Sequence, residues 1–197
     1  MKRRSLIFSL SGLIFILFAI PDATAALKPV TPCVIGQVGP GGGTIFYDAG
    51  SKQKWGRCLE AAPLRWSGVV QDPKAPWCNV FNVFFTSAVA SRSSVGVAIG
   101  KGFANTNLLL IAGCTSGAGV MAHAYHGGGK TDWFLPSKNE LHAMYVNRAV
   151  IGGFGVGVYW SSSENDANGG WVHYFKTNNQ YLRFKGIPNS VRPIRAF

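Results

Sequence analysis

The chain has 197 residues and a formal charge of +11, and its apolar residues (47%) far outnumber its charged ones (14%). This length predicts one domain or at most two small ones, and the apolar content excludes a charged disordered tail. The 25 glycines follow no three-residue period, which excludes a collagen-like protein and favours a strand-rich globule with glycine turns.

The first 25 residues have the order of a secretory signal peptide. Residues 2–4 are basic, an apolar run covers residues 6–20, and residues 23–25 form an A-x-A cleavage site. The apolar run is shorter than the ~20 residues that a membrane-spanning helix needs. We therefore expect export to the periplasm, the cell surface or the medium, with cleavage rather than anchoring. Cleavage removes three basic residues and one acid and leaves a formal charge of +9.

Residues 26–35 are predicted to be a short leader because two prolines discourage regular structure there. Residues 36–197 are predicted to form a single domain. It begins with a glycine run at residues 39–43, which predicts a turn, and continues into residues 44–47, which predict a strand.

The middle third carries helical signals. Residues 105–111, with Asn105 as a cap, and residues 118–125 predict two short helices. Ser137 and Glu140 have the spacing of a capping box, which predicts the start of a third helix. Its buried side is predicted to consist of Leu141, Met144 and Tyr145.

The last third has the two-residue period of strands. Segments at residues 158–161, 171–175, 181–185 and 191–197 are separated by Asn-, Asp-, Gly- and Pro-containing turns. This spacing predicts an antiparallel meander. Helices in the middle followed by a sheet at the end indicate an α+β domain.

Four cysteines remain after export, and an even number in an exported chain predicts two disulfides. We favour Cys33–Cys58 and Cys78–Cys114, since sequential pairing closes local loops. A zinc site is the alternative, but no C-x-x-C spacing is present and an oxidising compartment favours disulfides.

Several short strings occur together in a characteristic order: VGPGGGTIFYDAG, WGRCLEAAP, CTSGAG, GGGKTDWFLPSKNELHAMY, YWSSSE and VRPIRAF. On these strings the chain resembles the Lcl C-terminal-type domain, a bacterial family catalogued as a domain of unknown function. The resemblance covers roughly residues 36–197 and implies an exported bacterial protein. It also implies a C-type-lectin-like fold with a twisted antiparallel sheet, two to three helices and long loops.

Some members of this family are adhesion modules that bind glycans, sulfated ones included, and most members have no established activity. The family is distantly similar to formylglycine-generating sulfatase-modifying enzymes, which work with a reactive cysteine pair near the end of the domain. Here no cysteine follows Cys114. The chain also lacks a G-x-S-x-G elbow, and we expect no catalytic residues.

Calcium is a possible ligand, because lectin-like folds often bind it in loops and the ion needs several oxygen donors. The candidate donors in this sequence are Glu164, Asp166, Asn168 and Asp132. The E-P-N and W-N-D strings of calcium-dependent lectins are absent. We expect no other cofactor.

The positive charge favours an acidic partner. Alternation places Tyr181, Arg183 and Lys185 on one face of a strand, and we expect that face to be wet while Leu182 and Phe184 face the core. Arginine forks fit sulfate and carboxylate groups. The predicted site for an anionic glycan is Tyr181, Arg183, Lys185, Lys176, Arg192 and Arg195, unless these arginines pair internally with acids.

The sequence therefore predicts an exported binding or adhesion module for an anionic glycan or envelope polymer. The alternative is a structural domain of the cell envelope with a protein partner, and an enzyme ranks third. We expect no nucleic-acid partner and no transmembrane segment after cleavage. The ligand and the oligomeric state do not follow from the sequence.

Overall fold

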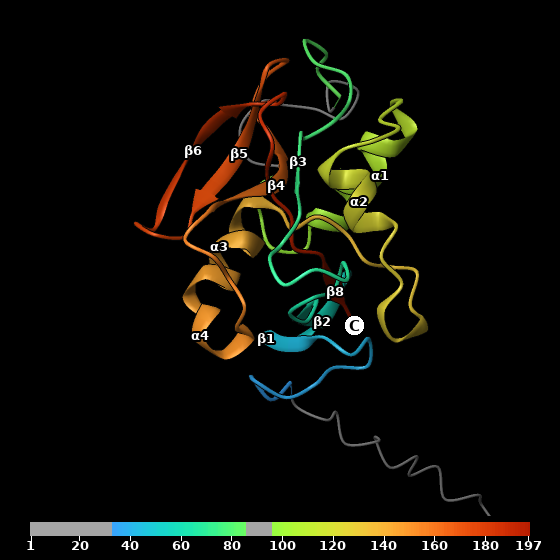
Figure 1. Ribbon diagram of the computed structural model, residues 1–197. Coiled ribbons are helices and arrows are strands. Elements are labelled where there is room, and N and C mark those ends of the chain that lie inside the picture. Colours follow the sequence, from blue (N-terminus) through green and yellow to red (C-terminus); the bar gives the residue numbers. More distant parts are fainter. Residues whose placement is uncertain (1–32, 86–95) are drawn as a thin grey trace, which may run out of the picture. The chain divides into compact units, whose positions relative to one another are not determined.

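The computed structural model describes residues 33–85 and 96–197 (Figure 1). The predicted signal peptide and residues 26–32 of the predicted leader lie outside the described residues. Within residues 33–85 and 96–197, no helix combines the length and apolarity needed to cross a bilayer.

The fold is α+β, as predicted, with two sheets. The smaller sheet has three antiparallel strands in the order β1-β2-β8. Its strands are β1 (Thr44–Gln53), β2 (Gly56–Ala61) and β8 (Ile194–Ala196). The strand predicted after the glycine run is β1. The chain's last strand therefore joins residues that lie near the start of the domain.

The larger sheet has five strands in the order β3-β7-β4-β5-β6. These are β3 (Lys74–Ala75), β4 (Val158–Glu164), β5 (Gly169–Tyr174), β6 (Asn179–Phe184) and β7 (Asn189–Ser190). The predicted antiparallel meander is present as β4, β5 and β6. The predicted continuation through residues 191–197 is wrong, because β7 pairs with β4 in parallel and β8 leaves for the other sheet.

The helices lie between these strands in the sequence. They are α1 (Gly102–Ile111), α2 (Ala118–His123), the 3-10 turn η1 (Gly127–Gly129), α3 (Lys138–Val146) and α4 (Arg148–Ile151). The prediction that Asn105 caps the first helix is wrong, since Lys101 holds that position. Asn105 is buried inside α1, and its amide donates to the carbonyl of Gly96 at 2.7 Å.

The predicted capping box at the start of α3 is confirmed. The backbone N–H of Ser137 donates to the Glu140 carboxylate at 2.7 Å, and the N–H of Glu140 donates to Ser137 Oγ at 3.3 Å. The N–H of Gly100 also donates to Glu140 at 2.7 Å. Burial nevertheless raises the pKa of the Glu140 carboxyl to about 7.

Alternating residues of the larger sheet pack into two cores, one on each face. Trp160 and Val172 lie in a core with α1 and α2, whereas Tyr159 lies in a core with Leu141 and Met144 of α3. Figure 1 shows α1 and α2 on one side of β4 and α3 and α4 towards the other. Leu141 and Met144 are buried as predicted, and Tyr145 is half-buried.

Both predicted disulfides are confirmed, with Cα–Cα distances of 5.7 Å for Cys33–Cys58 and 5.6 Å for Cys78–Cys114. The first joins the start of the described domain to β2. The second joins the segment after β3 to the residues that follow α1. Each bridge thus fastens a segment that has few backbone ladder bonds of its own.

The His173 side chain of β5 is buried against α3. Its ring stacks on Tyr145 at 4.7 Å and on His142 at 5.5 Å between centroids. Nε2 lies 3.1 Å from the Asn178 side-chain oxygen, while Nδ1 has no hydrogen-bond partner within the described part of the chain. Burial lowers the pKa of His173 to about 4, so the ring is neutral in the folded protein at neutral pH.

We predict that His173 makes the protein less stable as the pH falls from about 6.5 to 4. The unfolded chain binds this proton near the ordinary histidine pKa of 6.5 and the folded chain only near 4. Falling pH therefore favours unfolding, at most by about 3 kcal/mol for a shift of this size. The measurement is the free energy of unfolding in urea at several pH values.

The matched control is His173→Gln, which should show a shallower pH dependence whatever its absolute stability. The raised pKa of Glu140 acts in the opposite direction, since its proton favours the folded state between pH 4.5 and 7. That contribution is present in both proteins and cancels in the comparison. Identical pH slopes for the two proteins would contradict the assignment.

Candidate functional site

The prediction that Tyr181 and Arg183 lie on the solvent-exposed face of β6 is wrong, because the exposed and covered faces of this strand are the reverse of those predicted. Leu182 and Phe184, which we expected in the core, are 42% and 46% exposed. Tyr181 packs against the core that contains Trp160, and Arg183 donates to the Tyr181 hydroxyl at 3.1 Å. β6 is an edge strand, and α3 covers β4 and β5 instead. The outer face of β6 is therefore left open to solvent.

Lys185 is fully buried, so it is not part of a binding face. Its ammonium group donates to the Glu164 carboxylate and to the carbonyls of Val83 and Ala167, each of the latter at 2.9 Å. It also lies over the ring of Trp77, 4.7 Å from the centroid. Burial lowers the pKa of Lys185, although the adjacent carboxylate opposes that effect. Lys185 is thus a structural cation.

Arg192 is buried as well, and its partner is Asp72. Two parallel hydrogen bonds of 2.6 and 2.7 Å join the guanidinium to that carboxylate. The same carboxylate accepts from the Tyr159 hydroxyl and from the Trp66 indole, both at 2.9 Å. Every oxygen of Asp72 therefore has a partner, as a buried charge requires.

Arg195 is 9% exposed and lies between two acids. Its guanidinium donates to Asp132 at 2.5 Å and to Glu60 at 3.0 Å. Glu60 is fully buried under the glycine run, where it accepts from the backbone N–H groups of Gly41 and Gly43. Of the six residues predicted to bind a glycan, only Lys176 is exposed; Arg183 and Tyr181 are half-buried.

The four predicted calcium donors do not form one cluster. Glu164 pairs with Lys185, and Asp132 pairs with Arg195 beside the smaller sheet. Asp166 accepts from the backbone N–H groups of Asn168 and Gly169, at 2.8 and 2.7 Å, and so fixes its own loop. Within residues 33–85 and 96–197, no group of three or more His, Cys, Asp or Glu side chains is placed to hold a metal ion. Calcium binding stays a prediction.

These pairings use all the acids that the structure describes. Asp48, Glu60, Asp72, Asp132 and Glu164 contact lysine or arginine, and Glu140 and Asp166 accept from backbone N–H groups. Many cations have no such partner. In the described ranges, the lysines and arginines outside any ion pair are Lys52, Lys54, Arg65, Lys74, Lys101, Lys130, Lys138, Arg148, Lys176 and Arg183.

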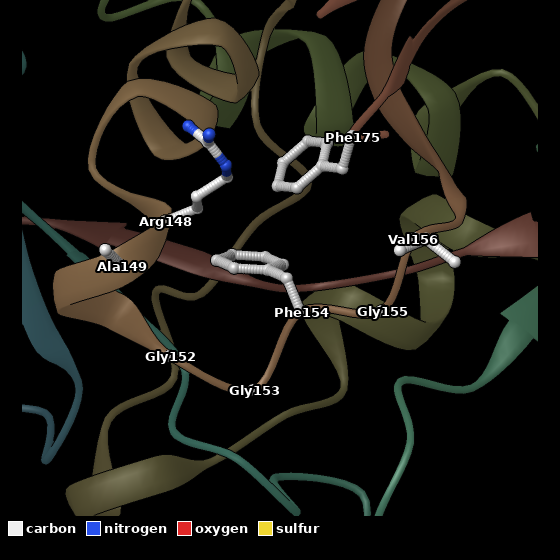
Figure 2. Close-up of a pocket in the computed structure, with 8 residues that line it drawn as sticks. All are labelled: Arg148, Ala149, Gly152, Gly153, Phe154, Gly155, Val156 and Phe175. Atoms are coloured by element: carbon white, nitrogen blue, oxygen red, sulfur yellow. The ribbon is translucent and has the colours of Figure 1, made fainter. Parts of the chain in front are cut away.

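A pocket of about 370 Å³ lies between α4, the loop that follows α4 and the residue after β5. Its walls are Arg148 and Ala149 of α4, the loop Gly152–Val156, and Phe175. Figure 2 shows the Arg148 guanidinium and the rings of Phe154 and Phe175 around one opening. The two rings lie 4.8 Å apart between centroids. One cation and two aromatic rings thus share this pocket.

Arg192 holds the pocket's glycine loop, residues 152–156, through hydrogen bonds to its carbonyl groups. The guanidinium donates to the carbonyls of Gly152 and Gly153 at 3.4 and 3.0 Å, and its carbon lies 4.6 Å from the Phe154 ring centroid. Both glycines have φ of +72°, a conformation that favours glycine. The Tyr159 hydroxyl accepts from the N–H of Gly155 at 3.2 Å. Arg192 was predicted to bind a ligand, but instead it holds the loop that lines this pocket.

Sequence reasoning missed Arg148, Phe154 and Phe175. The signal that was available is the run Gly152-Gly153-Phe154-Gly155-Val156-Gly157 between a helix and a strand, where an aromatic residue interrupts glycines. Such a run marks a loop with unusual backbone angles. It does not indicate which side chains of other elements lie around it.

Comparison with protein-family models found no match, and comparison with curated protein sequences found none either. The resemblance to Lcl C-terminal-type domains stays a prediction based on the strings given above.

We predict that Arg192→Met lowers the free energy of unfolding by about 3–5 kcal/mol, because it leaves the Asp72 carboxylate buried without its cation. The double variant Asp72→Asn with Arg192→Met should recover part of this loss, since it removes the unpaired charge. Urea unfolding at neutral pH measures both. Lys176→Ala, an exposed cation, is the control and should stay within about 0.5 kcal/mol of the wild type. A loss below about 1 kcal/mol for Arg192→Met would refute a stabilising role for the pair.

Proposed function

We propose that the protein is an exported binding module that recognises an anionic glycan or another anionic envelope polymer. The supporting observation is that each described carboxylate has a partner within the protein, whereas many lysines and arginines of the described ranges form no ion pair. A polyanion that approaches these lysines and arginines meets positive charge that no carboxylate neutralises in an ion pair. Such an excess of one sign raises the rate and the affinity of association with the opposite sign.

The unpaired cations come from separate elements rather than from one strand face. Lys52 and Lys54 lie at the hairpin between β1 and β2, Lys74 lies in β3, and Lys176 lies in the turn between β5 and β6. All four are exposed. A flexible polymer with repeated negative charges contacts scattered cations more readily than a small ligand does. The proposal is therefore a polymer partner with modest sequence or linkage selectivity.

Export and a C-type-lectin-like fold are part of this proposal. Two disulfides fit an oxidising compartment, and the mixed α+β architecture is compatible with a lectin-like domain. The family resemblance supplies the bacterial envelope as the setting. The proposal assigns no chemical step to the domain.

A second candidate function is a structural, protein-binding role in the cell envelope, as the sequence also allowed. The observation that favours it is the apolar outer face of the edge strand β6. Phe184 packs against Phe81 with ring centroids 5.6 Å apart, and both remain more than one third exposed, at 46% and 37%. Exposed apolar patches of this kind mark protein interfaces in many soluble proteins.

We predict that a sulfated or carboxylated glycan binds at low salt and that affinity falls steeply as salt rises, because screening shortens to ~8 Å at physiological ionic strength. Replacing Lys52, Lys54, Lys74 and Lys176 together with alanine should weaken binding. It should also lower the slope of log affinity against log salt by about one for each lysine that contacts the polymer, by analogy with nucleic acids. A glycan array at two salt concentrations, followed by titration, provides the measurement.

The matched control replaces the same four lysines with arginine and keeps the charge. It should bind like the wild type. Equal affinities for the alanine and arginine versions, or no polymer binding at low salt, would count against the proposal. Loss of a protein partner with Leu182→Ser and Phe184→Ser, with no glycan binding by the wild type, would instead favour the second candidate.

A further inference from the structure

The pocket beside α4 has features that the polymer proposal does not use. It is concave, about 370 Å³ in volume, and lined by two phenylalanine rings. Ligand pockets usually start near this volume and combine an apolar lining with few polar groups. A volume of this size accommodates one ring and its substituents rather than a chain of several sugars.

Arg148 supplies the charge of the pocket. It is exposed, and no carboxylate in the described ranges forms an ion pair with it. One of its nitrogens donates to the carbonyl of Tyr145 at 2.9 Å, and the guanidinium carbon lies 4.1 Å from the Tyr145 ring centroid. The side chain is thus held in place while its remaining N–H groups stay available for a ligand. Fixing a flexible arginine beforehand lowers the entropy lost on binding.

The carbonyl groups of the glycine loop do not compete for that charge. Those of Gly152 and Gly153 already accept from Arg192. Arg192 in turn is neutralised by Asp72, so the pocket has a single uncompensated cation. One guanidinium suits a singly charged group, and its fork matches the two oxygens of a carboxylate. A phosphate dianion needs more donors than this pocket provides.

The two phenylalanine rings of the pocket determine which chemical group of the ligand is attached to its carboxylate. Phe154 and Phe175 lie 4.8 Å apart with a tilt of 48°, and the exposed Val156 borders them. Phe154 is half-buried and Phe175 is 6% exposed, so Phe154 offers most of the aromatic surface to a ligand. Aromatic rings pack against flat apolar surfaces, including other rings. The buried contacts of Arg192 and Tyr159 keep the loop that carries Phe154 in position.

We propose that this pocket is a binding site for a ring-bearing carboxylate, with Arg148 on the carboxylate and Phe154 and Phe175 against the ring. The ring is either that of an aromatic acid or that of an acidic sugar. These share the same chemistry, and the experiment separates them. The site is independent of the scattered lysines proposed to bind a polymer.

The test is ligand-observed NMR and calorimetric titration with benzoate and with D-glucuronate, at constant ionic strength. Acetate supplies a carboxylate without a ring, and benzyl alcohol and D-glucose supply rings without a carboxylate. We expect a dissociation constant on the order of 1 mM for the preferred ring carboxylate, and at least about tenfold weaker binding of the matched controls. Preference for benzoate or for glucuronate identifies the source, and either result supports the site.

Arg148→Ala should weaken binding of the preferred ligand by about 10- to 100-fold, as expected for loss of a charged hydrogen bond. Arg148→Lys should recover only part, because lysine lacks the fork. Phe154→Ala should weaken the ring ligands while acetate is unaffected. Arg148 is exposed, so its variants are expected to fold, and the urea midpoint checks this.

Two outcomes would overturn the proposal: no binding of either ring carboxylate to the wild type, or equal binding by the wild type and a folded Arg148→Ala variant. The version with Lys52, Lys54, Lys74 and Lys176 replaced by alanine separates the two hypotheses. It should bind the ring carboxylate like the wild type even where it has lost the polymer. A failure of either proposal is then visible without the other.

Discussion

The ion pair between Asp72 and Arg192 is the contact on which the described domain most depends. The two residues are 120 positions apart. Around them the pair gathers Tyr159 of β4, the residues just after β2, and the glycine loop after α4. A buried charge pair contributes less net stability than its close geometry suggests, since both ions lose hydration. We expect its stronger effect to be on specificity, because other arrangements of these segments leave a bare charge in an apolar core.

The same principle accounts for the charge distribution. Most of the described acids pair with a particular cation or accept hydrogen bonds from backbone N–H groups. Glu60 does both, with Arg195 and with the glycine run. The positive excess therefore remains outside. Lys185, Arg192 and Arg195 stabilise the interior, whereas Arg148 and the exposed lysines face solvent. Net charge alone does not distinguish these two groups of cations, although their chemical roles differ completely.

The features that were predicted well are those set by local sequence. The Ser137–Glu140 capping box depends on four consecutive residues, and the β4–β6 meander depends on alternation and on turn residues. The prediction of the exposed face of β6 was wrong because alternation shows only that Tyr181 and Arg183 lie on the same side of the strand. It does not show which side the rest of the molecule covers. The pocket was missed because Arg148 and Phe154 meet Phe175, more than 20 positions later, only in the folded domain. Burial of Arg192 depends on Asp72, which no local pattern connects to it.

The pairing of β8 with β2 has a consequence for the order of folding. Residues 194–196 complete a sheet whose other strands lie at residues 44–61, and Arg195 also reaches Glu60 across 135 positions. Contacts this distant form slowly because a long loop must close first. The β4–β5 and β5–β6 hairpins join residues that are close in sequence, so we expect them to form early. The smaller sheet is complete only after β8 pairs with β2. The two disulfides span only 25 and 36 residues, so their cysteines can meet before β8 joins the smaller sheet.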